Sequence, residues 1–212
     1  YELKGNIVRF HLNQPINNKE ILVIDPLIFS TYTGSTASNW GYTATYDSKG
    51  NFYAGGIVFG NGFPASVGAY STSFSGPNNN GFDIAIMKFN STGTSRVYAT
   101  YLGGTNGSEQ PHSLVVDANN NLIIAGRTSS SNYPGIKYGV GGGGWDIVLS
   151  KLNSTGSALI GSRIIGGSGE DGVNIKDKEI CKSTANNPGC AESINRNYGD
   201  DARSEVILDG AG

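Results

Sequence analysis

The sequence is poor in the side chains that usually carry metal and acid-base chemistry. Its 212 residues include two histidines, two cysteines and one methionine, and only 15% are charged. His11 and His112 stand far apart, and no ligand cluster accompanies either of them. Nucleophile elbows, paired-carboxylate motifs and a glycine-rich phosphate loop that opens a helix are also missing. The sequence therefore predicts a protein that is not an enzyme and that binds no cofactor.

Strong charge of one sign and long apolar runs are scarce as well. The formal net charge is −2, and Lys and Arg are scattered singly, so the basic patch of a nucleic-acid binder is absent from the sequence. No apolar run approaches the roughly 18 residues of a membrane span. We therefore expect neither a nucleic-acid partner nor membrane insertion.

Glycine, tyrosine and small polar residues are abundant instead. The chain has 32 Gly and 11 Tyr, and no sustained helical periodicity runs through it. Gly and Asn tolerate the positive φ of tight turns, so a chain rich in these residues is typical of short strands connected by tight turns. The composition favours an all-β fold.

The chain contains an internal repeat. Segment 82–93 (FDIAIMKFNSTG) returns as 145–156 (WDIVLSKLNSTG), and other landmarks recur in the same order. A period this long, with four strand-like segments in each copy, is typical of propeller blades. We place the first copy at about 30–102, the second at 103–165, and a truncated third at 166–212 with an insert at 173–201.

Each full copy is expected to form a four-stranded antiparallel blade. The predicted strands are 42–46, 52–58, 83–89 and 96–101 in the first copy, and 112–116, 122–126, 146–152 and 158–165 in the second. We also expect a strand at 27–32, equivalent to the last strand of a copy, and a strand at 206–209 in the third copy. Together these elements would form a partial ring of about two and a half blades. Residues 1–26 differ from the rest, and we interpret them as a hairpin around 13–18 that ends an upstream β-rich domain, leaving 27–212 for the propeller repeats.

The repeated landmarks resemble a known family. Ser30-Thr31-Tyr32 and Thr100-Tyr101-Leu102-Gly103-Gly104, then the run from Asp47 to Gly56, Phe63-Pro64 and the run from Asp83 to Gly93 follow one another in order. This succession resembles the bacterial β-propeller repeat SBBP, whose pattern is roughly S-T-Y-L-G-G, D-x-x-G-N-x-Y-x-x-G, F-P-T and D-x-F-V-x-K-x-x-x-x-G. The likeness covers about 27–212. The insert and Thr33-Gly34-Ser35, where the family has Leu-Gly-Gly, depart from it.

The resemblance implies a secreted protein. Members are typically large, exported, multidomain bacterial surface proteins, often with a type IX secretion sorting domain, and this chain would be an N-terminal portion of one. The expected location is therefore extracellular or at the cell surface.

Two oxygen-rich turns are weak candidates for a calcium site. Asp47 with Asn51, and Asp117 with Asn121, resemble the alternating oxygen ligands that hold hard cations. Each turn supplies one carboxylate, whereas calcium sites usually gather several. We therefore favour hairpin turns stabilised by their Asp side chains, with Gly50 or Asn120 taking the positive φ.

Asp83 and Asp146 open equivalent strands, and Lys88 and Lys151 stand near the ends of those strands. Positions five apart point to opposite faces of a strand, so Asp and Lys of one strand cannot form a shared catalytic site. We expect structural hydrogen bonds or an inter-blade pair.

Cys181 and Cys190 both lie in the insert. A zinc site lacks further ligands there, and a local disulfide would constrain a polar surface loop, with two free thiols as the alternative. A disulfide would indicate an oxidising compartment.

The remaining candidates are loop side chains. Most aromatic residues are better explained by packing within the blades, but a loop aromatic such as Trp40 or Tyr138 could contact a ligand such as a sugar. Glu170 and Asp171 lie in a loop between blades, where they could line a channel mouth or hold a cation, although a solvated loop is the simpler interpretation. Contact residues are expected in the loops 35–41, 59–80, 105–111, 127–144 and 173–201.

Three hypotheses for function follow. The first is a non-catalytic extracellular module for adhesion, scaffolding, or binding of other protein chains or surface glycans. The second is a subunit of a filament or a secretion-associated assembly, a homo-polymer that pairs through open blade edges. The third is the non-catalytic part of a secreted propeller enzyme.

Overall fold

The computed structural model describes residues 2–4, 7–9, 31–77, 81–138, 144–169, 171 and 206–209, with the backbone alone at 2–4, 7–9, 137 and 138. The chain divides into two compact units, Tyr1–Ser30 and Thr31–Gly212. In the first unit, β1 (Glu2–Lys4) pairs antiparallel with β2 (Ile7–Arg9). The hairpin expected around 13–18 lies outside the described residues. Across the described ranges, no helix is long and apolar enough to cross a membrane.

The second unit contains two sheets whose strands follow the repeat. The first sheet has four antiparallel strands in the order β3 (Asn39–Tyr46), β4 (Phe52–Val58), β5 (Asp83–Phe89) and β6 (Arg96–Leu102). The second sheet has the order β7 (Glu109–Val116), β8 (Leu122–Thr128), β10 (Asp146–Leu152), β11 (Leu159–Ile165) and β9 (Ile136–Tyr138). All eight strands predicted for the two full copies are present, so the all-β interpretation is confirmed.

A bulge explains why the first strand of each sheet is longer than predicted. The pairing register shifts between Gly41 and Thr43 in β3 and between Pro111 and Ser113 in β7. A bulge interrupts the period-2 pattern, so the residues before it do not continue the alternation that marked the strand. At the bulges, a Cβ on Gly56 or Gly126 would lie 2.2 Å from the carbonyl oxygen of Trp40 or Gln110, respectively.

The hairpin turns use the predicted residues. Gly50 has φ 76° and Asn120 has φ 62°, which confirms the expected positive φ at both turns between the first two strands. Both residues close their turns by donating a backbone hydrogen bond to the carbonyl oxygen of Asp47 or Asp117, each at 2.9 Å. Equivalent turns therefore form from Asp-Ser-Lys-Gly-Asn and Asp-Ala-Asn-Asn-Asn.

The outer edge of each sheet is covered by its own connecting segment. In the first sheet, Ser66 donates to the carbonyl oxygen of Ala99 in β6 at 2.8 Å, and Tyr101 donates to that of Ser71 at 3.1 Å. In the second sheet, β9 runs parallel to β11. The sequence analysis did not predict β9, because three residues show no resolvable alternation. Covering an edge in this way removes a template for pairing with other chains.

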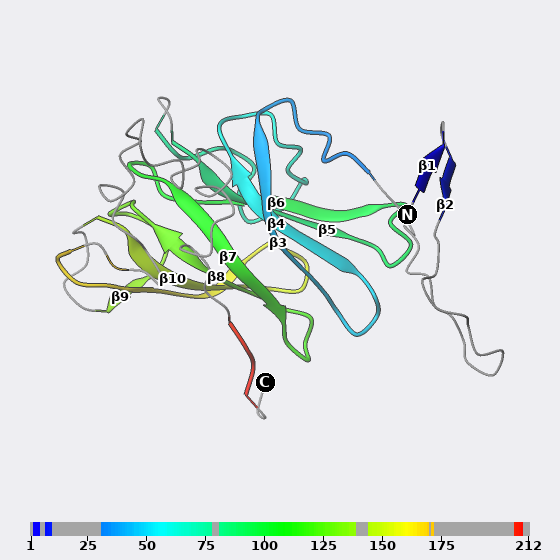
Figure 1. The fold of residues 1–212 in the computed structure, drawn as a ribbon. Coiled ribbons are helices and arrows are strands. Elements are labelled where there is room, and N and C mark those ends of the chain that lie inside the picture. Colours follow the sequence, from blue (N-terminus) through cyan, green and yellow to red (C-terminus); the bar gives the residue numbers. More distant parts are fainter. Residues whose placement is uncertain are drawn as a thin grey trace. The chain divides into compact units, whose positions relative to one another are not determined.

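The two sheets pack against each other, with β7 beside β3 and β4 (Figure 1). We call the buried cluster that they share the junction core. It takes Tyr53, Ile84, Ile86, Tyr98 and Leu102 from the first sheet, Leu114, Leu122, Ile124, Val148, Leu152 and Ile164 from the second, and Tyr133 from the connection between β8 and β9. The other face of the first sheet is covered by its own connection, through Phe63, Ala65 and Phe74.

Two expected strands at the ends of the unit are not formed where they are described. Thr31 and Tyr32 belong to no strand, and Tyr32 is 96% exposed, whereas its repeat equivalent Tyr101 is 1% exposed. Residues 206–209 also lie outside any strand, although the Val206 amide donates to Ser113 Oγ of β7 at 3.1 Å. A strand needs a ladder partner, and the described residues supply none for either segment.

Candidate functional site

The strands bring the repeated polar and aromatic residues to two ends of the sheets. The turn end holds the tight turns between β3 and β4, between β5 and β6, and their equivalents in the second sheet. The loop end holds the start of β3, the end of β4, the start of β5 and the longer connections. The candidate site residues from the sequence divide between these ends.

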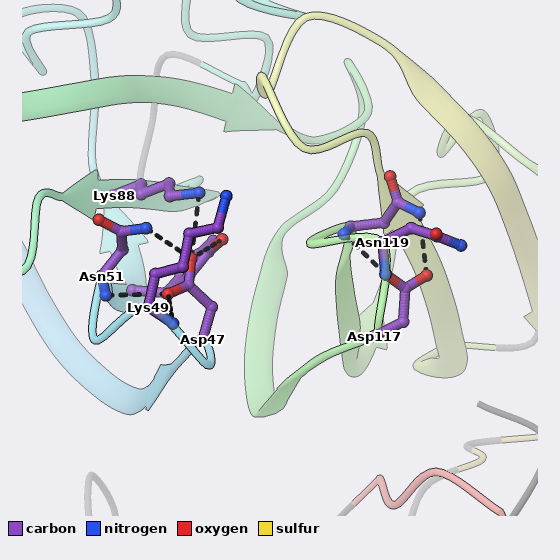
Figure 2. Close-up of polar contacts among 8 residues, drawn as sticks. Asp47, Lys49, Asn51, Lys88, Asp117 and Asn119 are labelled. Carbon is purple, nitrogen blue, oxygen red and sulfur yellow. Dashed lines mark hydrogen bonds and ion pairs between the residues drawn. The ribbon is translucent and has the colours of Figure 1, made fainter.

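At the turn end, Asp47 organises its own hairpin turn (Figure 2). Its Oδ1 accepts hydrogen bonds from the backbone amides of Lys49 at 3.0 Å and Asn51 at 2.9 Å. Its Oδ2 accepts from Asn51 Nδ2 at 2.8 Å and from the Tyr53 hydroxyl at 3.2 Å. Lys88 Nζ of β5 lies 3.4 Å from the same oxygen. Although burial opposes the shift, these hydrogen bonds and the ammonium lower the pKa of Asp47.

Asp117 repeats the arrangement in the second sheet. Its Oδ1 accepts from the amides of Asn119 and Asn121, each at 2.9 Å, and its Oδ2 accepts from Asn121 Nδ2 at 2.9 Å. Lys151 Nζ lies 2.7 Å from Oδ2. Burial opposes the shift here too, and the Lys151 contact together with the Asn121 hydrogen bonds lowers the pKa of Asp117 to about 2.

These contacts explain why a lysine recurs near the end of the equivalent strand in each sheet. Lys88 and Lys151 each pair with the turn aspartate of their own sheet, so neither lysine makes the inter-blade pair that the sequence left open. Every group placed on the two carboxylates is a donor or a cation, which is the environment of an Asp-stabilised turn. Within the described ranges, no three His, Cys, Asp or Glu side chains gather as a metal site. Calcium binding by Asp47, Asn51, Asp117 and Asn121 stays a prediction.

A row of aromatic rings runs along the loop end. The ring centroids of Trp40 and Phe59 are 5.1 Å apart, and those of Phe59 and Phe82 are 5.5 Å apart, both edge to face. Phe82 then stacks on Trp145 of the second sheet at 6.3 Å. Trp40 is 43% exposed and the other three rings are half-buried. We call these four residues the aromatic row; it crosses from one sheet to the other.

Basic and amide side chains flank the second-sheet end of the aromatic row. The Arg127 guanidinium lies 4.3 Å from the centroid of the Trp145 ring, a cation–π contact. Gln110 Oε1 accepts from Arg127 Nη2 at 2.8 Å and from Nε at 3.2 Å. Both flanking residues come from β7 and β8, next to the bulge.

Beneath the aromatic row, two carboxyl groups are buried in the junction. Asp83 opens β5, Glu109 opens β7, and both side chains are 0% exposed. The Glu109 amide donates to the Phe82 carbonyl oxygen at 2.8 Å, which fixes the start of β7 beside the start of β5. Burial raises the pKa of Asp83 to about 6 and the pKa of Glu109 to about 7.

The outer carboxyl oxygens have donors of their own. Asp83 Oδ2 accepts from the Ser75 amide at 2.7 Å, and Glu109 Oε1 accepts from Thr128 Oγ1 at 2.7 Å. Asp171 takes the place of Glu109 at the next position of the repeat. Its amide donates to the Trp145 carbonyl oxygen at 2.6 Å, as Glu109 does to Phe82, and its carboxylate accepts from the Gly167 amide.

The structure places only part of the remaining candidates. Trp40 belongs to the aromatic row, and the Asp171 amide is bonded to the Trp145 carbonyl oxygen beside the start of β10. The location of Asp171 between two blades stays a prediction. Glu170, Cys181 and Cys190 lie outside the described residues, as does the side chain of Tyr138. The disulfide stays a prediction.

The sequence analysis did not single out Glu109 or its contact with Asp83. A signal was available, because an acidic residue recurs at the matching place in the next copy, as Asp171, while an aspartate recurs at 83 and 146. The sequence analysis recognised Asp83 as a repeated residue that opens a strand, but a repeat alignment alone does not show that the start of β7 lies beside the start of β5.

The comparison with protein families decides what the two sheets are. Residues 97–134, which run from β6 across the junction to the end of the connection after β8, match the SBBP family, described as a beta-propeller repeat. The chain carries a β-propeller repeat. The first and second sheets are therefore consistent with consecutive propeller blades, each with four antiparallel strands. The comparison with curated proteins returned no match.

Proposed function

We propose that this chain is a non-catalytic propeller module of a secreted bacterial surface protein and acts in adhesion. Its loop end contacts surface glycans, with other protein chains as the second class of partner. The aromatic row supports this proposal most strongly, because partly exposed aromatic rings present large, rigid contact area together with polar edges. A row that spans two blades also offers a longer surface than one blade alone.

The polar surroundings of the aromatic row agree with a ligand that forms hydrogen bonds. The neighbouring loops carry exposed hydroxyl and amide side chains: Asn106 is hydrogen-bonded to Ser131, and Asn132 Nδ2 donates to the Thr105 hydroxyl. Loops on a rigid scaffold are the usual place for binding residues. The two blades, held by their junction core, supply that scaffold.

A polymer that pairs through open blade edges is less well supported. The outer edges β6 and β11 are already bonded to the connecting segments described above. A propeller enzyme remains the third hypothesis, and hydrolase or lyase activity measured with the chain would contradict our proposal directly.

Binding to an immobilised glycan panel tests the proposal, with Trp40→Ala compared with Tyr46→Ala. Both residues lie in β3, but Trp40 is at the loop end, while Tyr46 is 75% exposed at the turn end. We expect Trp40→Ala to weaken binding at least about tenfold, the loss of one aromatic contact, and Tyr46→Ala to leave it unchanged. Equal effects would contradict the proposal. Binding to proteins but to no glycan would favour the second class of partner.

A further inference from the structure

The buried acids at the junction leave two oxygens facing each other without a donor. Among the described residues, neither Asp83 Oδ1 nor Glu109 Oε2 has a hydrogen-bond donor. A Cβ on Gly103 would lie 2.5 Å from Asp83 Oδ1 and 2.7 Å from Glu109 Oε2, so both oxygens border the same small space. Two ionised carboxylates cannot donate to each other, and buried polar atoms without partners are costly.

One proton would satisfy both oxygens at once. The two side chains are within hydrogen-bonding reach of each other, and a carboxylic acid is a donor while a carboxylate is an acceptor. Two buried carboxyl groups at such close range cannot both hold a charge without strong repulsion, which favours the form that keeps one proton.

No basic side chain replaces that proton. The ion pairs that Lys88 and Lys151 form lie at the turn end and involve neither acid. The donors that are hydrogen-bonded to the pair are neutral: the Ser75 amide on Asp83 Oδ2 and the Thr128 hydroxyl on Glu109 Oε1. The Gly76 and Gly104 amides and the Ser130 hydroxyl, which lie near the pair, are neutral as well. The titratable groups that face the pair are Tyr101 of β6, near Asp83, and Tyr133, near Glu109.

We propose that Asp83 and Glu109 share one proton across the junction of the two blades and that this proton is a pH-sensitive clasp between them. When the pH rises, the proton leaves to solvent and two facing carboxylates remain at the start of β5 and β7. The junction is then weakened at the loop end, beside Phe82 of the aromatic row, whose carbonyl oxygen accepts from the Glu109 amide.

The sign of the pH effect follows from the directions of the two shifts. Both acids have a higher pKa in the folded chain than the value of about 4 expected when unfolded, so the folded state binds their proton more tightly. This stabilisation is fully present below about pH 4 and is lost as the pH rises through about 6 to 7. The clasp is closed in acid and released above neutrality.

His112 titrates with the opposite sign in an overlapping range. Burial, and the nearby Arg127 charge, lower the pKa of His112 to about 4, so its contribution to stability increases as the pH rises from 4 to about 6.5. The effect of the shared proton must therefore be measured as the difference in free energy of unfolding between the parent chain and variants of the pair. The pH dependence of the parent chain alone would also contain the contribution of His112.

Urea unfolding of the chain and of the double variant Asp83→Asn/Glu109→Gln, each at pH 5 and pH 8, tests the proposal, because either single variant would keep one buried acid whose pKa is raised by burial. Each amide keeps the shape of the acid and can donate to its partner, but it cannot release the proton. We expect the ratio of parent to variant unfolding constants to rise about ten- to a hundredfold from pH 5 to pH 8, because a proton lost between about pH 6 and pH 7 is lost one to two pH units above pH 5 and each unit is a factor of ten. Asp47→Asn is the control, because its pKa is lowered and its effect therefore changes only below about pH 4.

Carbon-13 NMR of the side-chain carboxyls in the parent chain gives a second, independent readout, needed if a variant fails to fold. The proposal predicts that the pair loses its last proton near or above pH 6. Two carboxyl groups that are both ionised at pH 5 would overturn it. So would a parent-to-variant ratio that is the same at both pH values, or added Ca²⁺ that stabilises the parent chain at pH 8 and not the double variant.

Discussion

Strands β5 and β10 have almost the same sequence pattern and very different surroundings. All seven residues of β5 are buried, whereas those of β10 alternate between buried and partly exposed. Ile86 is 0% exposed, and Leu149, its repeat equivalent, is 39% exposed. The difference arises because the second sheet covers the Ile84 and Ile86 face of β5, while no described sheet covers the corresponding face of β10. The burial of a repeat residue is therefore decided by its neighbouring blade.

The largest expected effect comes from removing the two equivalent aliphatic side chains. Ile86→Ala should lower the free energy of unfolding by about 3 kcal/mol, because it leaves a cavity in the junction core. Leu149→Ala should cost about 1 kcal/mol or less, since the side chain is only partly buried. Chemical denaturation of the two variants measures the difference, and equal losses would show that the face of β10 is covered as fully as that of β5.

Glycines in two turns provide a second comparison. Gly156 has φ 68°, and a Cβ there would lie 2.4 Å from the Tyr98 ring of the first sheet. Gly50 has φ 76°, but a Cβ there would meet only Ser91 at 3.4 Å. We expect Gly50→Ala to cost about 1 kcal/mol from backbone strain, and Gly156→Ala about 1 to 2 kcal/mol more from the clash. Thermal unfolding of both variants tests this, and matching losses would mean that the turn does not press on Tyr98.

Acid should weaken the turn of the second sheet through Asp117. Since the pKa of Asp117 is lowered to about 2, its stabilisation is present above about pH 4 and is lost as the pH falls toward 2. Asp117→Asn should therefore cost about 1 kcal/mol at pH 6 and progressively less toward pH 2. Urea unfolding at both pH values measures the change. A cost that does not depend on pH would assign the role to the shape of the side chain.

The smallest effect is expected from Lys151, which pairs with its turn aspartate as Lys88 does in the first sheet. The Lys151 side chain is 36% exposed and that of Lys88 is 8% exposed. Solvent screens the Lys151 pair, so Lys151→Met should cost about 0.5 kcal/mol, whereas Lys88→Met should cost about 1 to 2 kcal/mol because it leaves a more buried carboxylate. Added salt should reduce the Lys151 effect only. A larger cost for Lys151→Met than for Lys88→Met would contradict the explanation by the burial of the two lysines.

Much of the fold could be predicted because each strand and turn pattern occurs in two copies of the repeat. The strands 52–58, 83–89 and 146–152 match the observed bounds, and the positive φ of Gly50 and Asn120 followed from turn chemistry. Features that depend on contacts between elements could not be predicted in the same way. The short strand β9 is defined by its neighbour β11, and the residues of β3 and β7 before the bulges are paired only by β4 and β8.

The candidate site residues also differ in whether their contacts are local in sequence or join separate elements. The turn residues Asp47 and Asp117 were found because their partners are local in sequence, except for the lysines across the sheet. The pair of Asp83 and Glu109 escaped because it joins two blades, and the aromatic row was only partly recognised, through Trp40. Local hydrogen bonds leave a sequence pattern, whereas contacts across a junction require the geometry of the blades.

The stacking of the two sheets as neighbouring blades is tested most directly by a double-mutant cycle across the junction. A Cβ on Gly55 of β4 would lie 3.0 Å from Leu114 Cδ1 of β7. Gly55→Ala should therefore destabilise the chain by about 1 to 3 kcal/mol, and Leu114→Ala by about 2 to 4 kcal/mol. We predict that the double variant loses at least about 1 kcal/mol less than the sum of the two, because the methyl group occupies part of the space that Leu114 leaves. Additive losses would contradict the stacking.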